Sequence, residues 1–450
     1  MSHLRITDNQ EIELSKINGF TSEPDFDNLR LISNIRISSL SIADNNNLLI
    51  FPKSLNQYGD NISESCILSL YDNKIKTGNI MGFVGVNETQ LTISSRFDEN
   101  GNDYFMHYML QRVFSINLFD MKHSTSADSI FDFLIYLFPY YLKKALAQGL
   151  FKKYRRFEHN DANVKGTINV TQHIRQNTPF RGTVAYTTRE HSYDNEVTQL
   201  VRHTIEYIRL KEVGKTILTN DAETKNCVSQ IVMATPSYSN QKRVQIINQN
   251  LRPVRHPYFS EYTALQKLCL QILRHETIKF GKDKDKVYGV LFDGAWLWEE
   301  YLYTILKNYE FKHPQNKINE GGIKMFLKPN NVDDYNDGEE DFNKCYRKLY
   351  PDFYNDTKKI ILDAKYKHLN GKVGRDDLYQ VVTYMHCMEY KLGGYIYPAN
   401  NDCQMCKYKL AGLGGTIKVI PLQISQVKNN WSDFVGDMKS YEDDFIKQLQ

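Results

Sequence analysis

The sequence has little net charge, little glycine and proline, and no low-complexity tract. Its 56 Lys and Arg residues nearly balance 53 Asp and Glu residues, which leaves a formal net charge of +3. This balance excludes a disordered or histone-like chain with a large excess of charge of one sign. Any nucleic-acid surface therefore has to be a local patch. The 24 glycines and 12 prolines fall below average usage, whereas 41% of the residues are hydrophobic. We therefore expect a globular chain.

Cysteine is scarce, and the chain has no long hydrophobic run. Seven scattered cysteines, an odd number, do not suit a disulfide framework and favour a reducing compartment. The N-terminus lacks the apolar core of a signal peptide. The most apolar stretch, Ile130 to Leu142, contains Asp132 and Pro139 and is shorter than the ~20 residues that span a bilayer. We expect a soluble, unsecreted, cytoplasmic protein without a membrane partner.

Several ligand-binding and catalytic motifs are also absent. No G-x-x-x-x-G-K-[ST] motif occurs, so we expect that this chain binds no nucleotide itself. The histidines form no H-E-x-x-H motif, and there is no G-x-S-x-G nucleophile elbow. Cys403-x-x-Cys406 supplies only two of the four ligands of a structural zinc, which favours incidental thiols over a metal knuckle. The stretch Asp333 to Asp341 fails as a calcium loop because Tyr335 occupies a ligand position, and it indicates a solvated acidic loop.

The length of 450 residues suggests two or three domains. From Leu48 to about Arg96, alternating apolar and polar residues predict short antiparallel strands, with a hairpin connection at Gly85 to Thr89. After Asp103 the pattern becomes helical, and the polar segment from Gly281 to Gly289 predicts a domain boundary. The expected fold is a multidomain α+β and α/β protein with three regions: a β-rich module at 1–102, a mainly helical region at 103–280 and an α/β domain at 285–450.

Hydrophobic periodicity assigns individual elements within these regions. One helix follows Asp194, a candidate N-cap, and carries an apolar stripe of Val197, Leu200, Val201, Ile205 and Ile208. A second helix covers Glu261 to Thr277. The C-terminal domain is predicted to contain a helix at Ala295 to Tyr309, a hairpin at Tyr350 to Tyr366, a helix from about Asp376, and strands at GGYIYP and GTIKVIPLQI.

The predicted hairpin carries the residues that point to chemistry. The turn at Asn355-Asp356 sets Asp352 on one strand near Asp363 on the next. Since side chains alternate along a strand, Asp363 and Lys365 share a face. The spacing, Pro-Asp followed eleven residues later by Asp-x-Lys, is the PD-(D/E)xK nuclease signature. The alternative interpretation is a solvated strand face that bears a surface ion pair.

Convergent carboxylates suit a hard divalent cation, usually Mg²⁺ where substrate phosphates complete its ligands. Such an ion activates water and stabilises charge on phosphoryl oxygens, and Lys365 beside it could orient that water or stabilise the anionic transition state. Glu299 lies on the apolar stripe of its helix, which makes it a candidate third acid, whereas Glu300 points away as an ordinary exposed residue. Gln380 lies off the packing stripe of its helix and is free either to reach a water or phosphate or to remain a surface amide.

The segment from Lys143 to Arg156 contains six Lys and Arg residues and no acidic residue, interleaved with Phe151 and Tyr154. This composition suits phosphate contacts with aromatic packing. It suits an acidic partner surface or a solvated helix end equally well, so all three interpretations stay open.

The motifs LWEEYL, YPD, ILDAKYK, RDDLYQ and GGYIYP together closely resemble the nuclease domain of McrC proteins, the cleavage subunits of McrBC-type modification-dependent restriction systems. The segments FVGVNETQLTISSRF, VKGTIN and YDNEVTQLVRHTI resemble the N-terminal half of that family. The resemblance covers most of the chain, loosely before about Gly78. Trp298 stands where the family usually has Phe before the helix Glu, a conservative aromatic change.

The resemblance implies a role for each candidate residue and for a partner. Asp352, Asp363 and Glu299 would hold Mg²⁺, with Mn²⁺ a possible substitute, Lys365 would be the catalytic lysine, and Gln380 the accessory glutamine. It further implies an endonuclease that cleaves double-stranded methylcytosine-containing DNA as a phage defence. It implies an AAA+ GTPase partner of the McrB type, on which the N-terminal half docks and whose hydrolysis it stimulates.

Two other functions remain open at this point. One is a non-catalytic adaptor that regulates an AAA+ NTPase, against which the intact Asp352, Asp363 and Lys365 argue. The other is a self-sufficient restriction or repair nuclease, which would cleave specific DNA without nucleotide.

Overall fold

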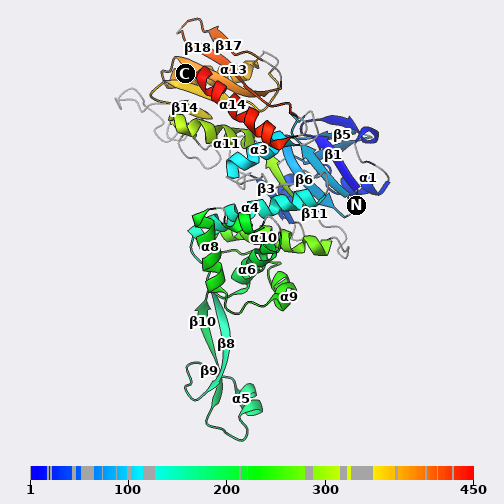
Figure 1. Cartoon of the computed structure of the whole chain (residues 1–450), viewed down its shortest axis with the longest axis vertical. Helices are drawn as coiled ribbons and strands as arrows, with labels where there is room; N and C mark the ends of the chain where they lie inside the picture. Colours follow the sequence, from blue (N-terminus) through cyan, green and yellow to red (C-terminus); the bar gives the residue numbers. More distant parts are fainter. Residues whose placement is uncertain are drawn as a thin grey trace, which may run out of the picture. The chain divides into compact units, whose positions relative to one another are not determined.

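A computed structural model of the whole chain divides into two compact units (Figure 1). Unit 1 combines Met1–Ala127 with Asp283–Gln450, and unit 2 is Asp128–Lys282. The structure describes residues 2–17, 20, 23–42, 47–51, 65–72, 74–87, 89–98, 103–114, 127–211, 214–219, 221–278, 287–314, 322–325, 348–369, 373–400, 403–412, 414–427 and 430–449.

A five-stranded mixed sheet organises the N-terminal part of unit 1. Its order is β1 (Ser2–Thr7), β7 (Thr89–Ser94), β6 (Ile80–Val86), β11 (Val287–Asp293) and β3 (Asn47–Phe51). Strands β6 and β7 pair antiparallel around Asn87, which confirms the predicted hairpin connection. A smaller sheet of β2 (Glu11–Glu13), β5 (Lys74–Thr77) and β4 (Leu68–Tyr71), with helices α1 (Glu23–Arg30) and α2 (Ile37–Ile42), completes this part.

Strand β11 departs from the predicted three-region division. It follows unit 2 in the sequence but pairs antiparallel with β6 and parallel with β3, so it belongs to the N-terminal sheet. Gly289, expected at a boundary, lies inside this sheet at φ +155°, where a Cβ would approach the Phe83 carbonyl oxygen to 2.2 Å. Helix α3 (Tyr104–Phe114), expected in the helical region, likewise belongs to unit 1 and packs against α11 (Gly294–Leu306).

Unit 2 is helical at one end and contains a strand ribbon that the sequence did not predict. The helices are α4 (Ala127–Ala147), α6 (Glu196–Arg209), α7 (Gly214–Thr219), α8 (Ala222–Ala234), α9 (Arg243–Gln249) and α10 (Glu261–Ile278). The apolar stripe predicted for α6 is buried, but the N-cap is Asn195 in a capping box, and not Asp194. The side chain of Asp194 accepts hydrogen bonds from Gln199 and from the backbone of Ser237 instead.

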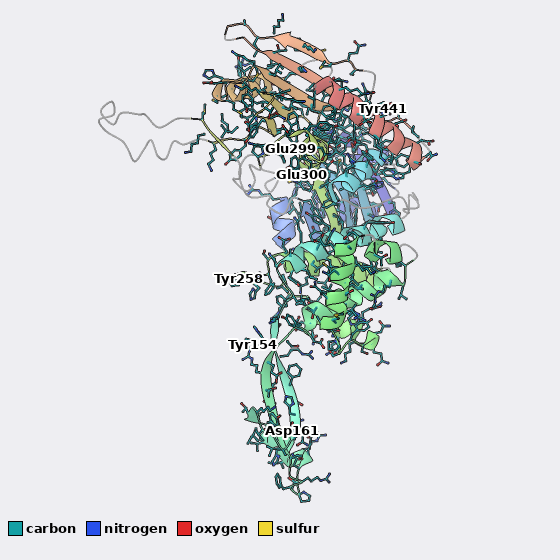
Figure 2. All side chains as sticks on the ribbon, turned by 60° about the vertical axis from the view of Figure 1, so that its left-hand side comes forward. Tyr154, Asp161, Tyr258, Glu299, Glu300 and Tyr441 are labelled. Carbon is teal, nitrogen blue, oxygen red and sulfur yellow. The ribbon has the colours of Figure 1, made fainter. Side chains whose placement is uncertain are left out.

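The ribbon consists of β8 (Lys153–Asp161) paired antiparallel with β10 (Val184–Ser192), which also pairs with β9 (Thr167–Ile168). Figure 1 shows it extending from the helices of unit 2, with helix α5 (Val170–Gln176) at its far end. Tyr154 near its base and Asp161 at the end of β8 are labelled in Figure 2. None of the residues of α5 is buried.

A second five-stranded sheet forms the C-terminal part of unit 1. Its order is β14 (Phe353–Asn355), β15 (Ile360–Ala364), β16 (Leu392–Ala399), β18 (Thr416–Gln423) and β17 (Cys406–Lys409). The three central strands run parallel, and each edge strand is antiparallel to its neighbour. Helix α13 (Arg375–Cys387) packs one side through Val381 and Met385 against Ile361 and Tyr395. Helix α11 packs against β15, and helix α14 (Trp431–Leu449) packs against β18.

The two parts of unit 1 meet in a buried polar cluster on three helices. Glu442 of α14 is 6% exposed and accepts hydrogen bonds from the hydroxyls of Tyr108 and Tyr301, both at 2.8 Å. It also pairs with Arg112 at 2.9 Å. Because Tyr108 and Arg112 belong to α3 and Tyr301 to α11, this carboxylate joins the N-terminal and C-terminal parts. Within the described residues, no helix is long and apolar enough to cross a membrane.

Candidate active site

The hairpin of β14 and β15 brings the two predicted aspartates together. Phe353 pairs with Leu362 in an antiparallel register, which places Asp352, the preceding residue, opposite Asp363. The Asp352 carboxylate accepts a hydrogen bond of 2.6 Å from the backbone N–H of Ala364, and its carbonyl oxygen lies 2.6 Å from the His313 ring. The hairpin therefore fixes both the backbone and the side chain of Asp352 beside the strand that carries Asp363.

Asp363 is the most buried acidic group of this site, at 1% exposure. Its Oδ2 lies 2.7 Å from the ammonium of Lys365, so the predicted shared face is observed. Burial and the Asp352 charge raise the pKa of Asp363 to about 7, although Lys365 opposes this effect. Burial also disfavours the charge of Lys365, but the carboxylates of Asp363, Asp352 and Asp377 outweigh it and raise the pKa of the ammonium.

Asp377 is a site residue that the sequence analysis did not single out. It lies in the first turn of α13, and its carboxylate contacts Lys365 at 3.3 Å and Lys367 at 2.6 Å. These cations hold the pKa of Asp377 below its usual range despite partial burial. The RDDLYQ motif contains the signal, because Asp377 and Gln380 are three residues apart and face the same side of the helix.

Gln380 is exposed and connects to the site through a tyrosine. Its side-chain amide donates a hydrogen bond of 2.9 Å to the Tyr384 hydroxyl, which in turn donates to the Tyr350 carbonyl at 3.4 Å. Burial raises the pKa of Tyr384, and the charges of Asp352 and Asp363 add to that shift. Gln380 is thus bonded to a hydroxyl that is close enough to Asp352 and Asp363 to be affected by their charges.

Glu299 occupies the border of the buried face of α11. Both Glu299 and Glu300, labelled in Figure 2, are half-buried, so the expected contrast with a fully exposed Glu300 is not observed. In the part of the chain that is described, no group of three or more His, Cys, Asp or Glu side chains is arranged to hold a metal ion. The structure therefore brings Asp352 and Asp363 together across the hairpin, and the role of Glu299 as a third ligand stays a prediction.

The weaker sequence signals have simple structural outcomes. Cys403 and Cys406 are exposed and form no disulfide within the described residues. The acidic stretch Asp333 to Asp341 lies outside the described residues.

The basic segment Lys143 to Arg156 is divided between the end of α4 and the start of β8, so it is not a single helix end. Several of its charges form ion pairs within unit 2: Lys143 pairs with Asp221, Lys153 with Glu196, and Arg155 with Asp194. These contacts reduce the positive charge that the segment offers to phosphates.

Comparison with known proteins identifies the family. Residues 75–398 match the family model of the McrBC 5-methylcytosine restriction system component, which is more than half of the chain. The fold is similar to a chain in the refined half-complex from the tetradecameric assembly of Thermococcus gammatolerans McrB AAA+ hexamers with bound McrC. That match has 14% identity and a TM-score of 0.51, and covers 98% of this chain and 99% of the other.

A chain of the T. gammatolerans McrBC complex also matches, with 14% identity and a TM-score of 0.35, over 68% of this chain and 87% of the other. No curated protein matches the sequence. The family match covers strands β6, β7 and β11 of the N-terminal sheet and the hairpin that carries Asp352 and Asp363, and the chain belongs to the McrC family of McrBC restriction system components.

Proposed function

We propose that this chain is the DNA-cleaving subunit of a McrBC-type restriction complex, with a PD-(D/E)xK nuclease domain built on β14, β15 and α13. The observation that supports this most directly is the buried Asp363, which faces Asp352 across the hairpin and is paired with Lys365 at 2.7 Å. The substrate we propose is double-stranded DNA containing methylcytosine, cut by phosphodiester hydrolysis.

The two aspartates fit a hard divalent cation such as Mg²⁺ or Mn²⁺. Asp363 Oδ2 is buried and accepts no hydrogen bond of good geometry within the described residues, although Lys365 Nζ lies close to it. A cation between Asp352 and Asp363 would offset the burial and the Asp352 charge that together raise the Asp363 pKa. When bound, such an ion supplies an activated water and stabilises charge on the phosphoryl oxygens.

The other residues of the site would hold the Lys365 ammonium in place and orient the attacking water or the phosphate. Lys365 remains protonated at neutral pH, since its pKa is raised, and can donate to an attacking water or to the anionic transition state. Asp377 contacts the same ammonium at 3.3 Å and keeps it near the carboxylates. Gln380, bonded to Tyr384, is exposed at the edge of the site, where it can reach a water or a phosphate.

We further propose an AAA+ GTPase partner of the McrB type, contacted through unit 2. The far end of the ribbon exposes apolar side chains that the chain itself does not cover: Val164, Ile168, Val170, Ile174 and Phe180. Exposed apolar groups gathered on one protruding element are typical of a protein contact surface. The similar T. gammatolerans chain comes from an assembly of McrB AAA+ hexamers with bound McrC, which is consistent with such a partner.

An Asp352→Ala variant tests the proposal in the complex with the partner. We expect assembly and GTP turnover at wild-type levels and no cleavage of methylated DNA in the presence of Mg²⁺. The matched control is Asp356→Ala, which removes an exposed carboxylate from the turn of the same hairpin and should leave cleavage intact.

Cleavage retained by Asp352→Ala would refute the site. If wild-type protein stimulates GTP hydrolysis but never nicks DNA, the chain is a non-catalytic adaptor. If the isolated chain cuts specific DNA without nucleotide, it is a self-sufficient nuclease.

A further inference from the structure

Tyr366 links the catalytic strand to the N-terminal part of unit 1. It follows Lys365 directly, and the alternation of side chains sends its ring to the opposite face of the strand. There the ring is 6% exposed and packs edge-on against Phe97, with ring centroids 5.2 Å apart. The Arg96 guanidinium lies 5.0 Å from the centre of the same ring. Both neighbours belong to the segment that directly follows β7.

We call the residues that surround the Tyr366 ring, Ser95, Arg96 and Phe97, the socket. Specific contacts also hold the Tyr366 hydroxyl in place there. Its oxygen lies 2.6 Å from the hydroxyl of Ser95, which is fully buried, and 3.2 Å from the Met81 sulfur. Burial raises the pKa of this hydroxyl, so it stays protonated and able to donate. A buried hydroxyl with a partner at this distance fixes its ring more firmly than apolar packing alone.

The socket is itself anchored in the N-terminal sheet. Arg96 forms an ion pair with Asp8, which is 1% exposed at the end of β1, and it also contacts Asn79. The backbone N–H of Arg96 donates to the same Asp8 carboxylate at 2.5 Å. The segment that receives Tyr366 is therefore held by polar contacts of its own with the N-terminal sheet.

Two constraints then act on the main chain at Lys365. On one side, its backbone N–H donates to the Ile396 carbonyl at 2.8 Å and extends the pairing of β15 with β16. On the other side, the next residue is clamped in the socket of Ser95, Arg96 and Phe97. A lysine ammonium that has to contact Asp363 at 2.7 Å depends on a fixed main chain beneath it.

We propose that Tyr366 is a positioning residue for Lys365, and that the N-terminal part thereby contributes to the geometry of the cleavage site. This inference rests on the proposed nuclease function. It assigns to the N-terminal part a role in cleavage itself, separate from any contact with a partner.

Tyr366→Phe and Ser95→Ala each remove one of the two hydroxyls that contact each other. The first variant keeps the aromatic ring, and the second keeps the packing around it. In the complex with the partner, methylated DNA and Mg²⁺, we expect each variant to lower kcat for cleavage by about ten- to a hundredfold, since misplacing a catalytic group by ~1 Å costs that much. The KM for DNA and the rate of GTP hydrolysis should not change. The matched control is Tyr390→Phe, which removes a buried hydroxyl bonded to Asp356 at the turn end of the hairpin, and it should cleave at the wild-type rate.

Hydrogen exchange of the Lys365 amide in the isolated full-length chain gives a second reading that does not require cleavage. We expect faster exchange in Tyr366→Phe and unchanged exchange in Tyr390→Phe. Wild-type kcat in both socket variants, or an equal loss in Tyr390→Phe, would overturn the inference. If wild-type protein does not cleave at all, the proposed function fails, and the exchange rate alone decides whether Tyr366 anchors the strand.

Discussion

Asp363→Asn should make unit 1 more stable at neutral pH, because the site holds a carboxyl group in surroundings that oppose its charge. Burial and the neighbouring Asp352 raise the pKa of Asp363 to about 7 from an ordinary value of 3.8. Asparagine has nearly the same shape but cannot ionise. The substitution therefore removes the cost of ionisation without opening a cavity.

The size and sign of the effect follow from proton linkage. Between pH 3.8 and about 7 the folded chain keeps a proton at Asp363 that the unfolded chain has released, so stability falls as the pH rises through this range. The pKa of Asp363 in the folded chain exceeds its pKa in the unfolded chain by about three pH units. At ~1.4 kcal/mol for each pH unit, ionised Asp363 lowers the free energy of unfolding by about 4 kcal/mol once the pH is above 7. Below about pH 4 both states are protonated, and the substitution should change little.

Denaturant unfolding of the full-length chain with a chelator present measures this effect. All three tryptophans, Trp296, Trp298 and Trp431, lie in unit 1, so their fluorescence reports that unit alone. We expect Asp363→Asn to be more stable than wild type by about 4 kcal/mol at pH 8, and the gain to shrink steadily as the pH is lowered toward 4.

Asp356→Asn is the control on the same hairpin. Lys312 and Tyr390 hold the pKa of Asp356 below its usual range, so removing its charge should bring no gain at pH 8. An Asp363→Asn variant no more stable than wild type at pH 8, or one with the same gain at pH 4 and pH 8, would refute the reasoning.

Two further predictions concern buried polar groups away from the hairpin. Glu442→Ala leaves the hydroxyls of Tyr108 and Tyr301 and the guanidinium of Arg112 without their shared acceptor, and it should cost unit 1 about 3–5 kcal/mol by tryptophan-monitored unfolding. A loss under about 1 kcal/mol would show that the cluster is dispensable. In unit 2, burial followed by the charges of Arg243 and Arg202 lowers the pKa of His203 to about 4, so stability should fall as the pH drops from 6.5 toward 4. His203→Leu should abolish this acid sensitivity in thermal melts followed by circular dichroism, and an unchanged pH profile would contradict the assignment.

The sequence predicted those parts of the site that depend on neighbours along the chain. A short turn between two strands fixes which residues face each other, so the pairing of Asp352 with Asp363 and the shared face of Asp363 and Lys365 follow from strand alternation. The same local periodicity located α6 and α10, whose apolar residues repeat every three to four positions. Motif resemblance, confirmed by the family match, supplied the family.

Only the tertiary structure decided the contacts between residues far apart in sequence. Periodicity cannot show that β11 crosses back to pair with β6, that the Asp377 carboxylate reaches Lys365, or that Tyr366 enters a socket at Ser95. It also missed the β8–β10 ribbon, because the residues of β8, KYRRFEHND, are mostly polar and show no alternation of apolar and polar side chains. The local pattern of residues indicates which face of a helix or strand is buried. Which other element covers that face depends on the packing of the whole unit.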